Sequence, residues 1–181
     1  MMRLPASAES LLEMLEIRAL SVDEMSSARY VVATSFARGA SEHYSRPQID
    51  AFVEFVRSPQ YSDLLVGNRA YGAFIDTEMV GVGAWSITEI KSPTARLIAV
   101  FVLPMFSGNG IGTRLAEYLE EEARAAGYRA QETSALLGAR GFFEHLGYHE
   151  TGEASWSLPS GRAIPVAMMR KIGDGRSDIM H

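Results

Sequence analysis

The chain has 181 residues, which is enough for one domain with a substantial core and too few for two ordinary domains. Hydrophobic residues make up 47% of it and charged residues 22%, a balance that argues against a disordered or fibrous protein. The formal net charge of −5 does not suit nucleic-acid binding, which needs a clustered basic face. We therefore expect one globular domain with no nucleic-acid partner.

The residue types that are missing narrow the chemistry further. The chain contains no cysteine, which excludes disulfides, thiolate metal sites and a cysteine nucleophile. His145, His149 and His181 are too scattered in the sequence for a metal site. No apolar run approaches the roughly 20 residues that a membrane helix needs, and the N-terminal segment lacks the apolar centre of a signal peptide. These features predict a cytoplasmic protein with no metal and no membrane partner.

The first part of the chain predicts a strand followed by a helix. Residues 1–13 are polar and rich in small side chains, and we expect a loose extension or a short helix there. Residues 14–20 alternate apolar and polar groups, as a strand does. Ser21 and Glu24 then have the spacing of a capping box, which predicts a helix that begins beside them.

A second helix and three strands follow. Ser45 before Pro47 suits the start of a helix, and one apolar face runs along it: Ile49, Phe52, Val53 and Val56. Residues 69–87 predict two strands around a turn at residues 76–78. Residues 95–104 form a nearly continuous apolar run, which is typical of a strand covered on both faces.

The last part of the chain begins with a glycine-rich loop and a helix. The helix carries one apolar stripe: Ile111, Leu115, Tyr118, Leu119, Ala123 and Ala126. Glu120 and Arg124 pair on its other side, at a favourable spacing. A strand, a short helix and two strands then follow, at residues 128–136, 139–147, 149–158 and 163–172. The pattern predicts one domain over residues 14–172, with an extension at 1–13 and a disordered tail at 173–181.

The glycine loop, "FSGNGIGTRL", is open to several interpretations. A phosphate loop of the Walker type needs a lysine after its last glycine, and none is present. A dinucleotide fingerprint needs a third glycine where Thr113 stands. A more general alternative is an anion site, because glycines expose backbone N–H groups and a helix N-terminus adds the positive end of its dipole. The remaining alternative is a flexible turn between a strand and a helix.

The surroundings of the loop resemble the GNAT superfamily of N-acetyltransferases. An apolar strand ending V-x-P precedes x-G-x-G-x-G and a helix, and a strand and the sequence A-x-x-F-F-x-x-x-G-Y follow, from Ala139 to Tyr148. The hairpin "DTEMVGVGAW" and the final "RAIPVAMMRK" are similar to family strands. The resemblance covers residues 14–171. It implies an α/β (α+β) fold in which about four helices flank a mixed, mostly antiparallel sheet of about seven strands, with one splayed parallel pair.

The resemblance implies a site for acetyl-CoA as cosubstrate. The backbone of Val100, Phe101 and Val102 would pair with the pantetheine arm, and an N–H group there would hold the oxyanion of the tetrahedral intermediate. The N–H groups of the loop would hold the pyrophosphate, at Ser107, Gly108, Asn109, Gly110, Ile111, Gly112 and Thr113. Arg140 would meet a cofactor phosphate, or else it is a plain surface arginine.

Three positions depart from the family's pattern. Ser107 replaces a usual glutamine or arginine, and Gly138 replaces an asparagine that touches the cofactor arm. Phe143 stands where a tyrosine usually protonates the departing thiolate. General-acid help is typically worth ~10²- to 10⁴-fold. A thiol with a pKa of roughly 8.5 is nevertheless a tolerable leaving group near neutral pH, so the resemblance still implies an enzyme.

The proton-transfer groups and the acceptor site have only candidates. Glu89, Glu132, Ser134 and Tyr148 are candidates for acid or base, and His43 and Tyr44 lie in the loop that helps form the acceptor site in this family. For Glu89, Glu132, His43 and Tyr44 the alternative is a plain solvated side chain. Trp85 and Trp156 lie in strand patterns and favour packing.

Three functions are compatible with these patterns. The first is an acetyl-CoA-dependent N-acetyltransferase in which a small amine attacks directly in a ternary complex, consistent with the lack of a cysteine for an acyl-enzyme. The second is a CoA-binding sensor or interaction module with little catalysis, and the third is a structural domain with a glycine-rich turn. The resemblance leaves the oligomeric state open, with a homodimer through the last strand as one alternative.

Overall fold

The computed structural model describes residues 7–173 of the chain. These residues form seven strands: β1 (Leu15–Ala19), β2 (Arg69–Ile75), β3 (Glu78–Ile87), β4 (Thr94–Val102), β5 (Ala130–Leu136), β6 (His149–Ser157) and β7 (Ala163–Ile172). They also form six α-helices: α1 (Ala8–Met14), α2 (Met25–Ala37), α3 (Arg46–Arg57), α4 (Pro59–Val66), α5 (Ile111–Ala125) and α6 (Arg140–His145). Short 3-10 turns are η1 (Val22–Glu24), η2 (Ala40–Glu42), η3 (Pro104–Phe106) and η4 (Leu137–Ala139).

The strands form one mixed sheet in the order β1-β2-β3-β4-β5-β7-β6. Every neighbouring pair is antiparallel except β4 and β5, which run parallel. The expected single α/β domain, with a mostly antiparallel sheet of seven strands and one parallel pair, is therefore confirmed. The turn between β2 and β3 uses Asp76 with a φ of 55°, a left-handed conformation that aspartate tolerates.

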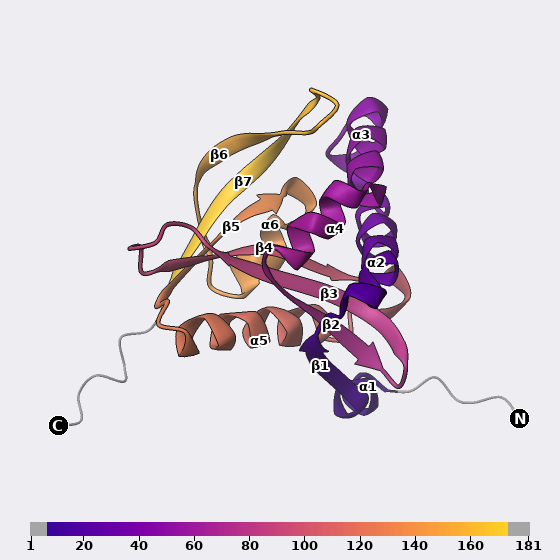
Figure 1. Ribbon diagram of the computed structural model, residues 1–181, viewed down its shortest axis with the longest axis vertical. Coiled ribbons are helices and arrows are strands. Elements are labelled where there is room, and N and C mark those ends of the chain that lie inside the picture. Colours follow the sequence, from indigo (N-terminus) through magenta and orange to yellow (C-terminus); the bar gives the residue numbers. More distant parts are fainter. Residues whose placement is uncertain (1–6, 174–181) are drawn as a thin grey trace, which may run out of the picture.

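Helices cover both faces of the sheet (Figure 1). Helices α2, α3 and α4 pack on one face, where Phe36, Phe52 and Leu65 meet strand residues such as Val82 and Ala99. Helices α5 and α6 pack on the other face. Helix α1 joins that second layer through Leu11 and Leu12, which pack beside Ile111 and Leu115 of α5. The two layers bury the central strands between them, and this explains the nearly continuous apolar sequence of β4.

Local capping chemistry determines where two helices start. Ser21 and Glu24 form the expected capping box before α2. Ser45 forms another with Gln48, and Pro47 occupies the first turn of α3. The described residues form six α-helices where about four were expected: α1 lies where a loose extension or a short helix was expected, and α4 has no counterpart in the prediction. Both are short, so their helical structure depends on packing against the rest of the fold.

Glu120 differs most from its expected environment. The pairing with Arg124 is present, with 3.6 Å between Arg124 Nη1 and Glu120 Oε2, but the expected surface position is wrong. Glu120 is 1% exposed and accepts hydrogen bonds from the Tyr148 hydroxyl at 3.0 Å and from Lys171 Nζ at 2.9 Å. These partners satisfy a carboxylate that burial would otherwise penalise. Burial and the nearby Glu120 carboxylate raise the pKa of the Tyr148 hydroxyl.

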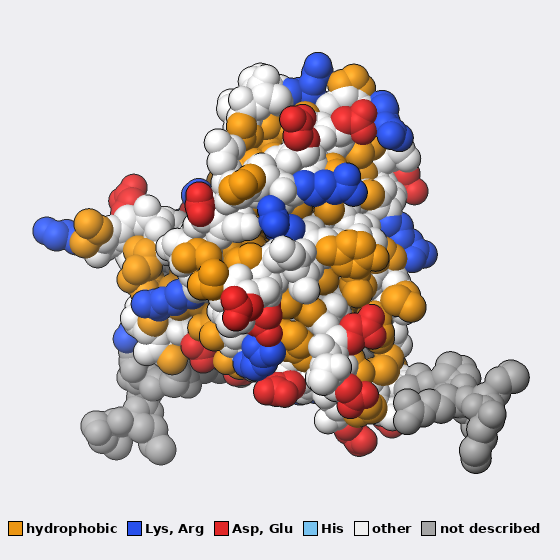
Figure 2. Space-filling model, turned by 45° about the vertical axis from the view of Figure 1, so that its right-hand side comes forward, with side chains coloured by type: hydrophobic (Ala, Val, Ile, Leu, Met, Phe, Trp, Pro, Cys, Tyr) orange, Lys and Arg blue, Asp and Glu red, His pale blue; other side chains and the backbone are white. Residues whose placement is uncertain are grey.

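The termini fall partly outside the structure. Residues 7–13 of the expected extension lie within the described part and belong mainly to α1, whereas residues 174–181 of the expected tail lie outside the described residues. No helix between residues 7 and 173 combines the length and the apolar character needed to cross a membrane. Figure 2 shows basic and acidic side chains interspersed over one face of the molecule, without a broad field of either sign.

Candidate active site: a cleft between two parting strands

The centre of the site is the point where β4 and β5 part. Their parallel pairing extends only from Thr94 with Ala130 to Leu97 with Thr133. Beyond that point β4 continues to Val102 beside β3, while β5 continues to Leu136 beside β7. Each strand therefore turns one edge of backbone N–H and C=O groups toward the gap, where they are free to bind another extended chain.

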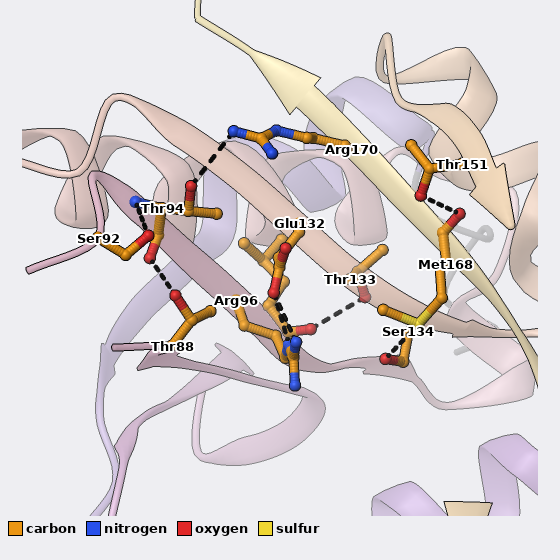
Figure 3. A network of polar contacts seen from close by, with 11 residues as sticks. Thr88, Ser92, Thr94, Arg96, Glu132, Thr133, Ser134, Thr151, Met168 and Arg170 are labelled. Carbon is orange, nitrogen blue, oxygen red and sulfur yellow. Dashed lines mark hydrogen bonds and ion pairs between the residues drawn. The ribbon is translucent and has the colours of Figure 1, made fainter. Parts of the chain in front are cut away.

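A β-bulge causes the parting. In the pairing of β3 with β4, Ala84 lies opposite Ala99 and Trp85 lies opposite Leu97, so Ile98 is an extra residue on β4. Ile98 and Ala99 consequently both pack on the face covered by α2 to α4. A bulge bends its strand and increases the local twist, which directs β4 away from β5. At the vertex, the Thr133 hydroxyl donates a 2.9 Å hydrogen bond to the carbonyl oxygen of Leu97 (Figure 3).

The glycine loop follows directly after β4. Gly108 and Gly110 have φ values of 78° and 81°, which other residues adopt only at a cost. The Asn109 side chain donates to the carbonyl oxygens of Phe106 and Ser107, and so holds the loop in shape. Helix α5 then starts, so the first N–H groups of a 15-residue helix face the loop without intrahelical acceptors. This arrangement suits an anion.

The loop and the parted strands enclose two adjoining cavities, which together we call the cleft. The loop cavity has a volume of about 430 Å³ and is lined by Ser35, Val100, Val102, Phe106, Ser107, Gly108, Gly110, Ile111, Gly112, Thr113, Gly138, Ala139 and Phe142. The inner cavity has a volume of about 290 Å³ and is lined by Ser35, Phe36, Arg38, Gly39, Ala40, Glu42, His43, Tyr44, Val100, Phe101, Leu136, Gly138 and Ala139. The two share Ser35, Val100, Gly138 and Ala139, so they form one continuous site.

Most of the residues predicted to contact the cofactor lie together in this cleft. They are Val100, Phe101, Val102, Ser107, Gly108, Gly110, Ile111, Gly112, Thr113 and Gly138. Three others do not line it. Asn109 bonds within the loop, and Arg140 lies 3.8 Å from Glu150 in an ion pair. Phe143 is 5% exposed and packs against Tyr148 in the core.

The loop is shaped for close approach at Gly112. A Cβ atom there would lie 3.2 Å from the Phe142 ring and 3.7 Å from the Val102 side chain, both of which line the cleft. Glycine thus leaves room for a ligand beside the first turn of α5. A CoA pyrophosphate fits this set of backbone donors, because it requires no particular side chain.

The candidate proton-transfer groups lie outside the cleft. Glu89 is exposed in the loop before β4, at the paired end of that strand. Glu132 accepts a 3.0 Å hydrogen bond from Arg96 Nε across the parallel pair (Figure 3). The Ser134 hydroxyl donates to the Met168 sulfur at 3.2 Å, and Tyr148 bonds to the buried Glu120.

The candidate acceptor residues line the inner cavity. The Tyr44 hydroxyl donates to the carbonyl oxygen of Pro165 and accepts from the N–H of Leu137, both at 2.9 Å. Tyr44 therefore joins the loop after α2 to β7 and to the turn after β5, and burial raises the pKa of its hydroxyl. His43 is exposed and lies against Gly138, where an added Cβ would be 3.2 Å from its ring.

A third cavity, the aromatic cavity, lies on the face of the sheet covered by α3 and α4. Its volume is about 200 Å³, and it is lined by Phe52, Phe55, Tyr61, Leu64, Arg96, Leu97, Ile98, Phe101, Ser134 and Trp156. Tyr61 is 4% exposed, and burial raises the pKa of its hydroxyl. That hydroxyl has no hydrogen-bond partner within residues 7–173. Phe101 lines both the aromatic cavity and the inner cavity, so the two are neighbours.

Sequence reasoning missed several lining residues. Ser35 comes from α2, Leu136 from the parted end of β5, and Phe142 from α6. The pair Phe142 and Phe143 was visible in the sequence, but only the rotation of α6 determines which ring faces the cleft. The bulge at Ile98 leaves no signal in an apolar run.

The acetyltransferase (GNAT) family model matches residues 31–148, which contain the glycine loop, both parting strands and α6. The chain belongs to the GNAT acetyltransferase family. No curated protein matches the chain. The resemblance inferred from the loop and α6 is thereby confirmed.

Solved structures share the fold of this GNAT protein. A GCN5-related N-acetyltransferase from Rhodopseudomonas palustris is 22% identical, with a TM-score of 0.78, over 87% of this chain and 94% of that one. The PaiA N-acetyltransferase from Thermoplasma acidophilum, solved with coenzyme A, is 19% identical with a TM-score of 0.67, over 87% and 98% of the two chains. A GNAT acetyltransferase from Brucella melitensis, solved with acetyl-CoA, is 25% identical with a TM-score of 0.56, over 75% and 82%.

No metal centre accompanies the cleft in the part of the chain that the structure describes. Residues 7–173 contain no group of three or more histidine, aspartate or glutamate side chains placed to hold a metal ion.

Proposed function

We propose that this GNAT protein is an acetyl-CoA-dependent N-acetyltransferase that acts on a small amine by direct attack in a ternary complex. The observation that carries the proposal is the parting of β4 and β5 after Leu97 and Thr133, directly beside the glycine loop. The open edge of β4 would pair with the pantetheine arm, and the loop would hold the pyrophosphate. One similar protein solved with acetyl-CoA and another solved with coenzyme A support this choice of cosubstrate.

In the proposed reaction the neutral amine nitrogen attacks the thioester carbonyl, the C–S bond breaks, and the amine gives up one proton. Backbone N–H groups on the open edge of β4 would stabilise the oxyanion, because they are fixed before the reaction begins. The Tyr148 hydroxyl is bonded to the buried Glu120, and Ser134 lines the aromatic cavity and not the cleft. We therefore assign protonation of the thiolate to water, which a leaving group with a pKa of roughly 8.5 tolerates.

A CoA-binding module with little catalysis is the second candidate, and one observation favours it. The carboxylates named as candidate bases lie outside the cleft, since Glu132 pairs with Arg96 and Glu89 lies at the far end of β4. The inner cavity still offers His43 and Glu42, which line it and can accept a proton. The enzyme therefore remains the first choice.

Two measurements test the proposal. A ligand that binds only the folded state raises the apparent stability, so saturating acetyl-CoA should raise the Tm by several degrees. Release of free thiol from acetyl-CoA should then depend on added amine. An unchanged Tm would rule out both CoA-binding functions, whereas a raised Tm without thiol release from any class of amine would favour the binding module.

A further inference from the structure

The aromatic cavity is large enough to hold a ring. Its volume of about 200 Å³ exceeds the roughly 150 Å³ that suffices for benzene in an apolar protein cavity. Phe52 and Trp156 lie nearly parallel, with ring centroids 6.4 Å apart and planes at 16°. The Phe55 and Tyr61 rings pack edge to face, with centroids 5.4 Å apart. Aromatic walls of this kind favour another aromatic ring.

The charges around the cavity argue against a second cation on the acceptor. None of its lining residues is acidic, and its one basic lining residue, Arg96, is paired with Glu132. A diamine or polyamine bound here would bring an ammonium group beside Arg96 without a free carboxylate. An acceptor with a single amine and an uncharged remainder avoids that penalty.

The polar groups of the cavity point to one hydrogen-bonding substituent on the ring. Tyr61 is more than nine-tenths buried, and its hydroxyl is without a partner among the described residues. A ring that covers this hydroxyl and displaces water from it has to pair with it, because the hydroxyl would otherwise be left unsatisfied. Ser134 supplies a second hydroxyl, whose acceptor in the structure is the weakly accepting sulfur of Met168.

From these contacts we infer that the acceptor is an arylalkylamine whose ring carries a hydroxyl group, with the ring in the aromatic cavity and the amine in the inner cavity. Phe101 lines both spaces, so the aliphatic link passes beside this ring. The inference rests on the proposed acetyl transfer and adds the substrate class to it.

The first test compares tyramine, 2-phenylethylamine, butylamine and putrescine at saturating acetyl-CoA. We expect kcat/KM for tyramine to exceed those for butylamine and putrescine by at least about tenfold, since filling an apolar pocket discriminates by that much. If putrescine or butylamine equals tyramine while thiol is released, the inference is overturned and the acetyltransferase proposal stands.

The second test uses a matched pair of variants on α4. Leu64 lines the cavity and is 39% exposed, whereas Val66 is 55% exposed and does not line it. Leu64→Glu should lower the tyramine-to-putrescine ratio of kcat/KM about tenfold, because it places a carboxylate at the cavity. Val66→Glu should leave that ratio unchanged, and neither variant should alter the Kd of acetyl-CoA. Equal effects of the two variants would overturn the inference.

The third test addresses the hydroxyl of Tyr61. Tyr61→Phe should lower the tyramine-to-phenylethylamine ratio about three- to tenfold, as expected for one lost hydrogen bond. An unchanged ratio would contradict the assigned role of this hydroxyl.

A fourth test applies if acetyl-CoA raises the Tm but no amine is acetylated. In that case, calorimetric titration of tyramine into the CoA complex measures whether the ring binds in the aromatic cavity. Binding that Leu64→Glu abolishes and Val66→Glu preserves supports the inference, and absent binding overturns it.

Discussion

The cleft and the aromatic cavity meet at Phe101, yet they are built in different ways. The loop half of the cleft comes largely from one continuous stretch, residues 100–113, shaped by glycines and a helix N-terminus that expose backbone N–H groups. The aromatic cavity consists of side chains from α3, α4, β4, β5 and β6, which are far apart in the sequence. A backbone site leaves a local motif in the sequence, whereas a side-chain site of this kind leaves none.

This difference predicts that single substitutions in the loop weaken the binding of acetyl-CoA more than they change the choice of acceptor. The largest expected effect is that of Gly112→Asp, which should raise the Kd of acetyl-CoA at least about 100-fold. The new carboxylate would lie beside Phe142 in the cleft and repel the pyrophosphate. Stability without ligand should fall modestly, because aspartate suits the first turn of a helix but its Cβ at 3.2 Å requires the Phe142 ring to shift.

Gly141→Asp is the matched control for that change. A Cβ at Gly141 of α6 meets no atom within 4 Å, so the same charge is introduced in open space. Binding should be as in the unchanged protein, measured by titration calorimetry. A comparable loss in both variants would show that net charge, and not the loop, governs acetyl-CoA binding.

A change at the point where β4 and β5 part should affect the stability of the protein more than its substrate specificity. Thr133→Val removes the hydroxyl that bonds to the Leu97 carbonyl and leaves that buried oxygen without this donor. We expect a loss of about 2 kcal/mol in the free energy of unfolding in urea. Thr151→Val, at an exposed hydrogen bond on β6, should stay within about 0.5 kcal/mol. Equal losses of unfolding free energy in the two variants would mean that the hydrogen bond between Thr133 and Leu97 stabilises the fold no more than an exposed one.

Tyr44 supports the wall of the inner cavity through its hydroxyl. Removing this hydroxyl should lower the free energy of unfolding somewhat less than Thr133→Val does. Tyr44→Phe removes the hydroxyl that joins Pro165 and Leu137, which should lower the free energy of unfolding by about 1–2 kcal/mol. Tyr30→Phe is the control, since Tyr30 is 65% exposed on α2. Thermal and urea unfolding of both variants provide the comparison. An equally large loss of stability in Tyr30→Phe would contradict the stabilising role of the Tyr44 hydroxyl.

The smallest effect should come from an ion pair outside both regions. Arg18 Nη2 lies 2.6 Å from Glu24 Oε1, and hydrogen bonds from Arg18 and from the Ser21 N–H lower the pKa of Glu24 to about 2. A folded-state pKa below the unfolded one stabilises the fold above the unfolded value, and the contribution disappears as the pH falls toward about 2.

Glu24→Gln should therefore lower the free energy of unfolding at neutral pH, by under about 1 kcal/mol because the pair is partly solvated. The difference from the unchanged protein should shrink between about pH 5 and pH 2 in urea titrations. Asp23→Asn serves as the neighbouring control. A difference that grows toward low pH would contradict the assignment, and acetyl-CoA binding should be unaffected.

Local chemistry in the sequence was sufficient for the elements that depend on neighbours in the chain. The capping boxes at Ser21 and Ser45 predicted two helix starts, and the apolar run before Pro104 predicted a strand covered on both faces. The glycine loop predicted a strand, a tight loop and a helix, and its resemblance to the GNAT family identified the family. The domain limits and the roles of the individual site residues stay predictions.

Only the tertiary structure determined which side chains meet. The expected stripe of α5 placed Glu120 outside it, but the fold buries this carboxylate because Tyr148 and Lys171 reach it from other elements. The rotation of α6 turns Phe142 to the cleft and Phe143 to the core. The extra residue at Ile98 separates β4 from β5, and an apolar run does not reveal it. The local backbone conformation follows from short-range chemistry. These side-chain contacts depend instead on packing between segments that are far apart in the sequence.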